Sequence, residues 1–305
     1  MFRGTDRLFI RLIGCAALSA IGVQLAMALF LGHGAFPILA HAGWGFLTDS
    51  VWNPVLDHFG ALPILYGTVL SALLALCLAA PLGFGIAIFL AELAPRWLRA
   101  VVGPLVELLA AIPSVIYGLW GIFVLIPWLR DSGEPHLIRA LGFLPLFRGP
   151  AYGIGLFAAG VILAIMILPI ITALSRDVLL AVPNTQREAA LALGATRWEM
   201  IRIAVLRYGR SGLLGAVFLG LGRALGETMA VTMVIGNRPD ITASLFAPAQ
   251  TMASLLANEF AEATGELHRS ALFAVGLLLF VVTLGINALA RVMVHRLVPQ
   301  RRSVA

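Results

Sequence analysis

The stretch REAALALGATRWEMIRIAVLRYGR, residues 187–210, is a polar, helix-patterned insert between two long apolar segments. Thr185 and Thr196 each precede a glutamate by three residues, which is the spacing of a capping box at a helix start. Gly194 lies between these signals, where a residue without a side chain permits the left-handed turn that ends a helix. The pattern predicts two short helices joined by a turn, and this helix–turn–helix segment at residues 187–210, called the elbow below, could bind another protein. An amphipathic hairpin that merely joins two membrane spans would carry the same signals.

The composition is that of a membrane protein. Of the 305 residues, 60% are hydrophobic and 12% are charged, and the mean hydropathy is +0.97. Soluble domains carry about 25% charged residues, and a membrane-spanning helix needs about 20 apolar residues. The sequence therefore predicts an all-α integral membrane protein with six transmembrane helices, at residues 9–31, 62–91, 101–128, 152–174, 211–236 and 271–294.

The basic residues predict the orientation, because all of them are arginines and cytoplasmic loops carry the excess of positive charge. With a cytoplasmic N-terminus, fifteen arginines lie on that side: Arg3, Arg7, Arg11, Arg96, Arg99, Arg176, Arg187, Arg197, Arg202, Arg207, Arg210, Arg291, Arg296, Arg301 and Arg302. Five lie opposite: Arg130, Arg139, Arg148, Arg238 and Arg269. We expect both termini and the elbow in the cytoplasm. No nucleic-acid partner is expected, because the arginines are divided among loops that form no stacking platform.

The sequence offers no site for chemistry of its own. The histidines are scattered without metal-ligand spacing, so no metal site is expected. A phosphate-binding P-loop requires a lysine, and the chain has none. No nucleophile and base stand in a recognisable arrangement either. The chain is expected to bind no cofactor and not to be an enzyme, so any ATP that drives it must bind a partner chain.

The fifth predicted span contains the one clear intramembrane charge pair, Arg223 and Glu227. Four residues of separation place them on one helical face, where an ion pair is tolerated far better than two isolated charges. Arg223 offers planar donors to an oxyanion such as phosphate, and Glu227 balances its charge. The other interpretation is that the pair only pins the helix against its neighbours. Thr228 adds a hydroxyl near the same face, although hydrogen bonding to the helix backbone also accounts for it.

Glycine and proline punctuate the spans. Small residues in the fifth span allow another helix to approach closely and suggest the interface of a homo- or heterodimer: Gly215, Gly220, Gly222 and Gly226. Prolines in or at the ends of spans predict bends or breaks: Pro81, Pro104, Pro113, Pro127 and Pro169. The outer loop at 237–270 contains SLFAPAQTMASLLANEF, which is patterned as a helix and is the expected docking surface for an extracytoplasmic partner.

The elbow resembles the EAA loop of ABC importer permeases, in which Glu-Ala-Ala is followed by a glycine. The resemblance implies a cytoplasmic coupling helix that docks into a groove of a separate ATPase. That motif usually closes with an apolar residue and Leu-Pro, whereas Arg207 stands here in place of the proline. The residues expected to form the coupling loop are Glu188, Ala189, Ala190, Gly194 and Arg197.

Four strings together resemble the PstC-type permease subunit of the bacterial phosphate ABC importer: IPSVIYGLWGIFVLIPW at 112–128, the EAA loop at 188–207, GRALGETMAVTMVIGN at 222–237 and TMASLLANEF at 251–260. The resemblance implies a type I ABC importer permease fold in the bacterial inner membrane. It implies as partners a PstA-type permease, a PstB-type ATPase dimer that uses ATP and magnesium, and a periplasmic phosphate-binding protein. The family's intramembrane charged residues match Arg223 and Glu227, so these two and Thr228 are expected to line the substrate pathway.

Three segments follow from this resemblance. Residues 1–61 are expected to hold a cytoplasmic tail, the first transmembrane helix and a periplasmic loop, residues 62–294 the permease core, and residues 295–305 a cytoplasmic tail. Two alternatives to phosphate import are an importer of another oxyanion, sulfate or molybdate, and an ion-coupled secondary transporter that uses the charge pair as a gate. The elbow argues against the latter, since such a protein needs no loop for an ATPase.

Overall fold

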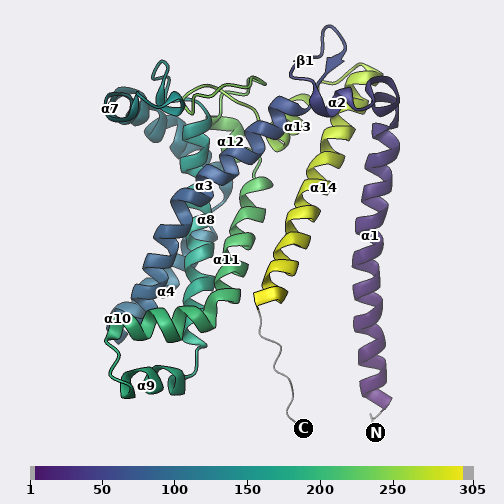
Figure 1. Ribbon diagram of the computed structural model, residues 1–305. Helices are drawn as coiled ribbons and strands as arrows, with labels where there is room; N and C mark the ends of the chain where they lie inside the picture. The colour runs from purple at the N-terminus through teal and green to yellow at the C-terminus, as the bar shows by residue number, and fades with distance from the viewer. Residues whose placement is uncertain (1–3, 298–305) are drawn as a thin grey trace.

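The computed structural model describes residues 4–297 and is a bundle of long helices capped at one end by short helices and a hairpin (Figure 1). Six helical runs in this part of the chain are long and apolar enough to cross a membrane: Phe9–Ala42, Leu62–Leu93, Ser114–Leu141, Leu156–Leu180, Arg197–Leu225 and Glu266–Arg296. The predicted number of spans is confirmed, but several bounds differ. Arg3, Arg301, Arg302 and the expected tail beyond residue 297 lie outside the described residues.

The centre of the bundle is the pair α3 (Leu62–Ile88) and α8 (Leu156–Leu180), against which α11 (Arg207–Leu225) also packs. Small residues make this contact close. A Cβ atom at Gly160 would lie 2.4 Å from the Leu74 side chain, and Ala75 and Ile167 are fully buried in the same apolar cluster. Lipid tails are as apolar as these side chains, so membrane helices associate mainly through such close packing.

Helix α1 (Gly4–Ala42) lies beside α14 (Glu266–Leu297) at one side of the bundle (Figure 1). The prediction that the first span ends at residue 31 is wrong. The helix continues because Ala35 and Ile38 are buried against α14. The Ile38 backbone N–H also donates a hydrogen bond of 3.0 Å to Ser270 Oγ. The loop before α3 is correspondingly shorter than predicted.

The third predicted span, 101–128, is not one helix. Helix α4 (Arg96–Ala110) ends, residues 111–113 turn, and α5 (Ser114–Trp120) begins. Pro113 is the physical cause, because proline has no N–H to continue a helix and disfavours helical backbone in the residue before it. After α5 the chain continues through π-helical turns and short helices: η2 (Gly121–Leu125), α6 (Ile126–Trp128), η3 (Leu129–Gly133) and α7 (Glu134–Leu141).

The capped end of the bundle is built from short elements: α2 (Gly45–Thr48), the antiparallel strands β1 (Trp52–Asn53) and β2 (His58–Phe59), η4 (Pro145–Phe147) and α13 (Met252–Glu259). Helix α13 confirms the helical pattern predicted in the outer loop only from Met252 onward, because residues 244–251 form turns and a bridge and are not helical. The hairpin is tied to α13 because Trp52 Nε1 donates to Glu259 Oε2 at 3.0 Å. His268 Nε2 lies 2.9 Å from the same carboxylate oxygen.

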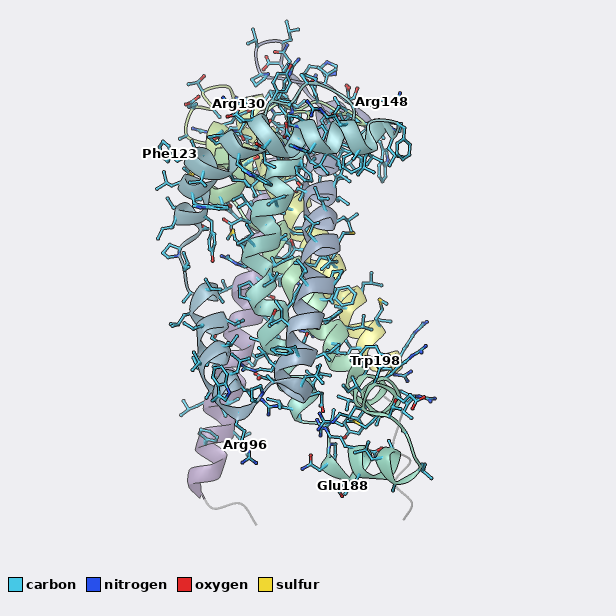
Figure 2. All side chains as sticks on the ribbon, turned by 90° about the vertical axis from the view of Figure 1, so that its left-hand side faces the viewer. Arg96, Phe123, Arg130, Arg148, Glu188 and Trp198 are labelled. Atoms are coloured by element: carbon cyan, nitrogen blue, oxygen red, sulfur yellow. The ribbon has the colours of Figure 1, made fainter. Side chains whose placement is uncertain are left out.

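The labelled charged residues separate between the two ends of the bundle. Arg130 and Arg148 lie at the capped end, and Arg96 and Glu188 lie at the opposite end (Figure 2). The first residues of α1 and the last of α14 also point toward the end that carries Glu188 (Figure 1). This arrangement agrees with the predicted grouping of the arginines, while the side of the membrane that each end faces stays a prediction.

Candidate functional site

The helix that carries the predicted charge pair is interrupted. It runs from Arg197 to Leu225 through α10 (Arg197–Met200), η5 (Ile201–Leu206) and α11, and α12 (Met229–Val234) follows as a separate helix. The single span predicted at 211–236 is therefore wrong at both ends. Gly226 ends α11, consistent with the poor helix propensity of glycine. The chain restarts after Thr228, whose φ of −106° and ψ of −67° depart from ideal helical values.

The predicted ion pair between Arg223 and Glu227 is confirmed as a contact. Arg223 Nη2 lies 3.4 Å from Glu227 Oε2, although Glu227 stands in the interruption and not in the helix. The other oxygen of the carboxylate, Oε1, accepts a hydrogen bond of 3.4 Å from the Ala230 N–H, in the first turn of α12. The two partners differ in exposure: 45% of the Arg223 side chain is accessible, against 3% for Glu227. Glu227 is thus a buried anchor and Arg223 a partly accessible cation.

The hydroxyl of Thr228 donates to the Gly226 carbonyl oxygen at 3.4 Å. The hydroxyl of Thr232 donates to the Thr228 carbonyl oxygen at 2.7 Å. Both hydroxyls therefore bond to the local backbone, as the alternative interpretation of Thr228 requires. The expected role of Thr228 in a substrate pathway stays a prediction.

Helix α12 packs on α5, so the helices that follow the two interruptions are in contact. The contact is close because Gly118 has no side chain: a Cβ there would lie 3.2 Å from Ala230 Cα and 2.5 Å from Met233 Sδ. On α11, by contrast, a Cβ at Gly215 or Gly222 would meet no atom within 4 Å. These two glycines leave an open face on the helix that carries Arg223.

The elbow has the predicted turn and one of the two predicted capping boxes. Gly194 has φ +85°, in the left-handed region. Thr196 Oγ1 accepts from the Glu199 N–H at 3.3 Å, and Glu199 Oε2 accepts from the Thr196 N–H at 2.8 Å. The predicted box at Thr185 is wrong: α9 (Asn184–Ala192) begins one residue before it, with Pro183 at the cap position and no side-chain cap. The fixed φ of proline sets this earlier start.

The second helix of the elbow is also not short, because α10 continues through η5 into α11. Movement of this helix would therefore reach Arg223 directly. Of the predicted coupling residues, Glu188, Ala189, Gly194 and Arg197 are exposed and Ala190 is buried. Glu188 and Trp198 lie at the same end of the bundle (Figure 2). Their role in docking stays a prediction.

Some residues at this end were missed by the sequence analysis. Leu193 is 90% exposed and Trp198 is 59% exposed, which is an apolar surface suited to a protein partner. Arg187, counted there only as a positive charge, forms a salt bridge with Glu92. Ninety-five positions separate these two residues, so no local sequence pattern could have paired them.

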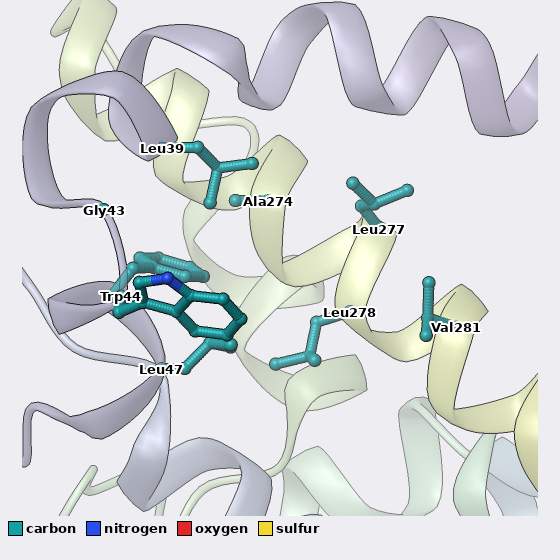
Figure 3. A pocket seen from close by; sticks show the side chains of 9 residues that line it. Leu39, Gly43, Trp44, Leu47, Ala274, Leu277, Leu278 and Val281 are labelled. Atoms are coloured by element: carbon teal, nitrogen blue, oxygen red, sulfur yellow. The ribbon is translucent and has the colours of Figure 1, made fainter.

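An apolar pocket of about 390 Å³ lies between the α1–α2 region and α14, lined by Leu39, Gly43, Trp44, Phe46, Leu47, Ala274, Leu277, Leu278 and Val281 (Figure 3). None of these lining residues is charged, so the pocket offers nothing to an oxyanion. It is separate from the Arg223–Glu227 pair. Among the described residues, no group of three or more histidine, cysteine, aspartate or glutamate side chains is arranged to hold a metal ion.

Residues 83–300 match the family model described as the binding-protein-dependent transport system inner membrane component. Among curated relatives, the phosphate transport system permease protein PstC of Mesorhizobium japonicum is 50% identical, over 97% of this chain and 92% of the relative. PstC of Pasteurella multocida is 46% identical, over 97% of this chain and 92% of the relative. PstC 2 of Mycobacterium tuberculosis is 45% identical, over 95% of this chain and 91% of the relative.

Two solved transporters share the fold. The MetNI methionine ABC transporter in an inward-facing conformation matches with a TM-score of 0.58 and 20% identity, over 77% of this chain and 94% of that chain. A bacterial ABC transporter that imports alginate matches with a TM-score of 0.56 and 18% identity, over 96% and 100%. The fold is thus that of type I ABC importer permeases, and the interrupted, six-span chain belongs to the binding-protein-dependent transport system inner membrane components and, within them, to the PstC permeases.

Proposed function

We propose that this chain is the permease subunit of an ATP-driven phosphate importer, with Arg223 on the substrate pathway. The partly accessible side chain of Arg223, beside the interruption between α11 and α12, carries the proposal. The PstC relatives at 45–50% identity support phosphate as the cargo. Substrate sites of membrane transporters often lie where helices are discontinuous.

The geometry suggests how an anion could pass. Arginine presents several N–H donors in one plane, which suits the oxygens of phosphate. Glu227 is fixed by the Ala230 N–H and Arg223, so it neutralises the guanidinium when no anion is bound. A bound phosphate would compete with this carboxylate for Arg223. The competition keeps binding weak enough for release, and Thr228 lies beside the pair as a further polar group.

The chain is not itself an enzyme, because PstC permeases are transport subunits and a partner ATPase handles ATP. The elbow is the proposed contact with that partner, a PstB-type dimer that uses ATP and magnesium. Glu188, Ala189, Ala190, Gly194 and Arg197 would lie in the contact. The exposed Leu193 and Trp198 give it an apolar component. Since α10 is continuous with α11, movement of the elbow would be passed to the helix of Arg223.

Two further partners complete the proposal. A PstA-type permease would cover the open face of α11 at Gly215 and Gly222, where the small residues permit close helix approach. A periplasmic phosphate-binding protein would dock at the capped end, over the 237–270 region. Both termini and the elbow then face the cytoplasm of the bacterial cell, as the arginine distribution predicts. Residues 62–294 form the proposed permease core, flanked by residues 1–61 and 295–305.

The test is uptake of radiolabelled phosphate in cells that lack their own high-affinity system, supplied with the partner subunits and either the wild-type chain or Arg223→Gln. Sulfate is the competitor, and Arg139→Gln, an exposed arginine on α7, is the matched control. We expect uptake to be lost only with Arg223→Gln and to resist sulfate. Unchanged uptake in that variant contradicts the pathway assignment, and competition by sulfate contradicts phosphate as the preferred cargo.

A further inference from the structure

Arg187, in the first turn of α9, makes an unusual number of contacts for a residue in a proposed docking loop. Its guanidinium donates to Glu92 Oε1 from Nη2 at 2.7 Å and to both carboxylate oxygens from Nε at 3.2 and 3.3 Å. It also donates to the Leu179 carbonyl oxygen at 2.8 Å, to the Val182 carbonyl oxygen, and to Asn184 Oδ1 at 3.3 Å. Only 15% of its side chain is accessible.

Apart from Asn184 of α9 itself, the partners of Arg187 lie at or just beyond the ends of two other helices. Glu92 lies in η1 (Phe89–Leu93), the π-helical turn that continues α3, and its side chain is 7% exposed. Leu179 lies in the last turn of α8 and Val182 follows that helix, and a cation is favourable beside the carbonyl groups at a helix C-terminus. One part-buried guanidinium therefore joins α9 to the ends of α3 and α8.

An apolar contact between α9 and the bundle supports the connection of α9 to η1 and α8. Ala190 is buried with Ala91 of η1, Leu179 of α8, and Ile201 and Val205 of η5. Small residues on both sides allow α9 to lie close to the bundle. The polar contacts of Arg187 then fix α9 on this apolar surface, because the donors of a planar guanidinium have fixed directions and bonding to a carboxylate constrains its orientation.

The opposite end of α9 is attached differently. Gly194 connects it to α10 with φ +85°, and a Cβ there would meet no atom within 4 Å. α9 is thus joined by polar contacts to η1 and the end of α8 at its start, packs on η5 along its apolar face, and continues into α10 through an open glycine turn.

We propose that Arg187 is a positioning residue whose contacts with Glu92 and the end of α8 make α9, α3 and α8 move as one body. The inference rests on the proposed function, because it assigns to the coupling loop a defined path into the permease: an ATPase that moves α9 also moves the central helix pair. Without the guanidinium, α9 could shift on its apolar surface without moving α3 and α8. ATP would then be hydrolysed with less transport.

The test uses the complete transporter in proteoliposomes, with its partner permease, ATPase and binding protein, and measures phosphate transported per ATP hydrolysed. Coupling changes within a packed network commonly amount to about 2- to 30-fold, and we expect the ratio to fall within that range for Arg187→Gln. Glu92→Gln should lower it as well. Arg187→Lys should give an intermediate ratio, because one ammonium cannot meet the carboxylate and the α8 carbonyls together. Arg96→Gln, which removes an exposed arginine at the same end, is the control and should leave the ratio unchanged.

A second readout follows the position of α9 directly and needs no transport. Spin labels on cysteines at Leu93 and Thr185, in a chain whose Cys15 and Cys77 are replaced by serine, report the distance between η1 and α9 within the same complex. We expect a narrow distance distribution in the wild type with and without ATP, and a broadened or shifted one in Arg187→Gln.

The outcomes separate the two proposals. A wild-type ratio together with an unchanged distribution in Arg187→Gln overturns the positioning role. Absence of phosphate transport in the wild type contradicts the proposed function, while the spin-label comparison still decides the role of Arg187. If Arg187→Gln does not assemble, Glu92→Gln and Arg187→Lys decide by the same two measurements.

Discussion

The unequal burial of Arg223 and Glu227 predicts that neutralising one partner has different consequences from neutralising the other. In Arg223→Gln, a carboxylate that is 3% exposed loses its cation and retains the Ala230 N–H at 3.4 Å. In Glu227→Gln, the remaining arginine has a side chain that is 45% exposed, so its charge can be hydrated or meet a bound anion. Arg223→Gln is therefore expected to destabilise the assembled complex more than Glu227→Gln.

The magnitude follows from the burial of the pair. Removing one partner of a fully buried ion pair costs about 3–5 kcal/mol, and exposed pairs contribute less than about 1 kcal/mol. Since Arg223 is partly accessible and the two atoms are 3.4 Å apart, we place the free-energy cost of Arg223→Gln at about 2 kcal/mol by interpolating between these two cases. Glu227→Gln should cost less than about 1 kcal/mol. The double variant should resemble Glu227→Gln in stability, because no buried charge is left without a partner.

The three variants should rank differently in phosphate transport than in stability. Hydrogen bonds to charged groups contribute about 1.5–3 kcal/mol, so loss of the guanidinium should lower phosphate uptake about 10- to 100-fold in both Arg223→Gln and the double variant. Glu227→Gln should retain phosphate entry and slow its release, because nothing competes with the anion for Arg223.

Two assays on the three variants test these expectations. Loss of the purified complex on heating ranks the variants by stability, and uptake of radiolabelled phosphate ranks them by transport. The reasoning about burial is refuted if the double variant is as unstable as Arg223→Gln. The reasoning about anion recognition is refuted if the double variant regains uptake, since it lacks the guanidinium.

Three more substitutions probe the local geometry. The Cβ of Gly194→Ala would meet no atom within 4 Å, but alanine must adopt a left-handed backbone there, so the substitution should cost about 1–2 kcal/mol of stability. It should also lower the ratio of transport to ATP hydrolysis, and Gly194→Asn should partly restore that ratio. An unchanged ratio for Gly194→Ala contradicts a role for the turn. Gly67→Ala places a Cβ 2.1 Å from a backbone carbonyl oxygen and should abolish assembly, whereas Gly85→Ala meets nothing within 4 Å and should not; similar complex yields contradict this packing. Thr196→Ala should cost about 1 kcal/mol and speed amide exchange at the start of α10, while Thr185→Ala leaves exchange at the start of α9 unchanged; equal effects contradict the assignment of one capping box.

The sequence predicted features that depend on composition or on short spacing. Six spans followed from runs of apolar residues, because each span must be apolar by itself. The contact of Arg223 with Glu227 followed from their four-residue spacing, and the Thr196 capping box from three. The interruptions of helices were harder to predict from the sequence, because proline and glycine are tolerated inside membrane helices. Pro113 interrupts a helix here, whereas Pro169 lies inside α8.

Features that depend on distant residues could not be predicted. Glu92 and Arg187 each look like an ordinary charge at the end of a span, and only the fold brings them to 2.7 Å. The failure at Thr185 has a local cause, since its spacing fits a capping box but Pro183 starts the helix earlier. The first span was underestimated because the prediction followed only the apolar run that ends at residue 31. Burial of later residues against α14 keeps the chain helical beyond that point.

The two interruptions explain why a charge pair at this position serves both the fold and an anion. In a bilayer, backbone groups released by a break need partners from the protein. Tyr117 spans the first interruption, where its hydroxyl donates to the Leu109 carbonyl oxygen at 2.9 Å. Glu227 serves the second by accepting from the Ala230 N–H. That carboxylate is buried, so it requires a cation, and Arg223 supplies one while part of its side chain stays accessible. The structural and transport interpretations of the pair are therefore compatible: the break requires Glu227, Glu227 requires Arg223, and the accessible side of Arg223 is what an anion would meet.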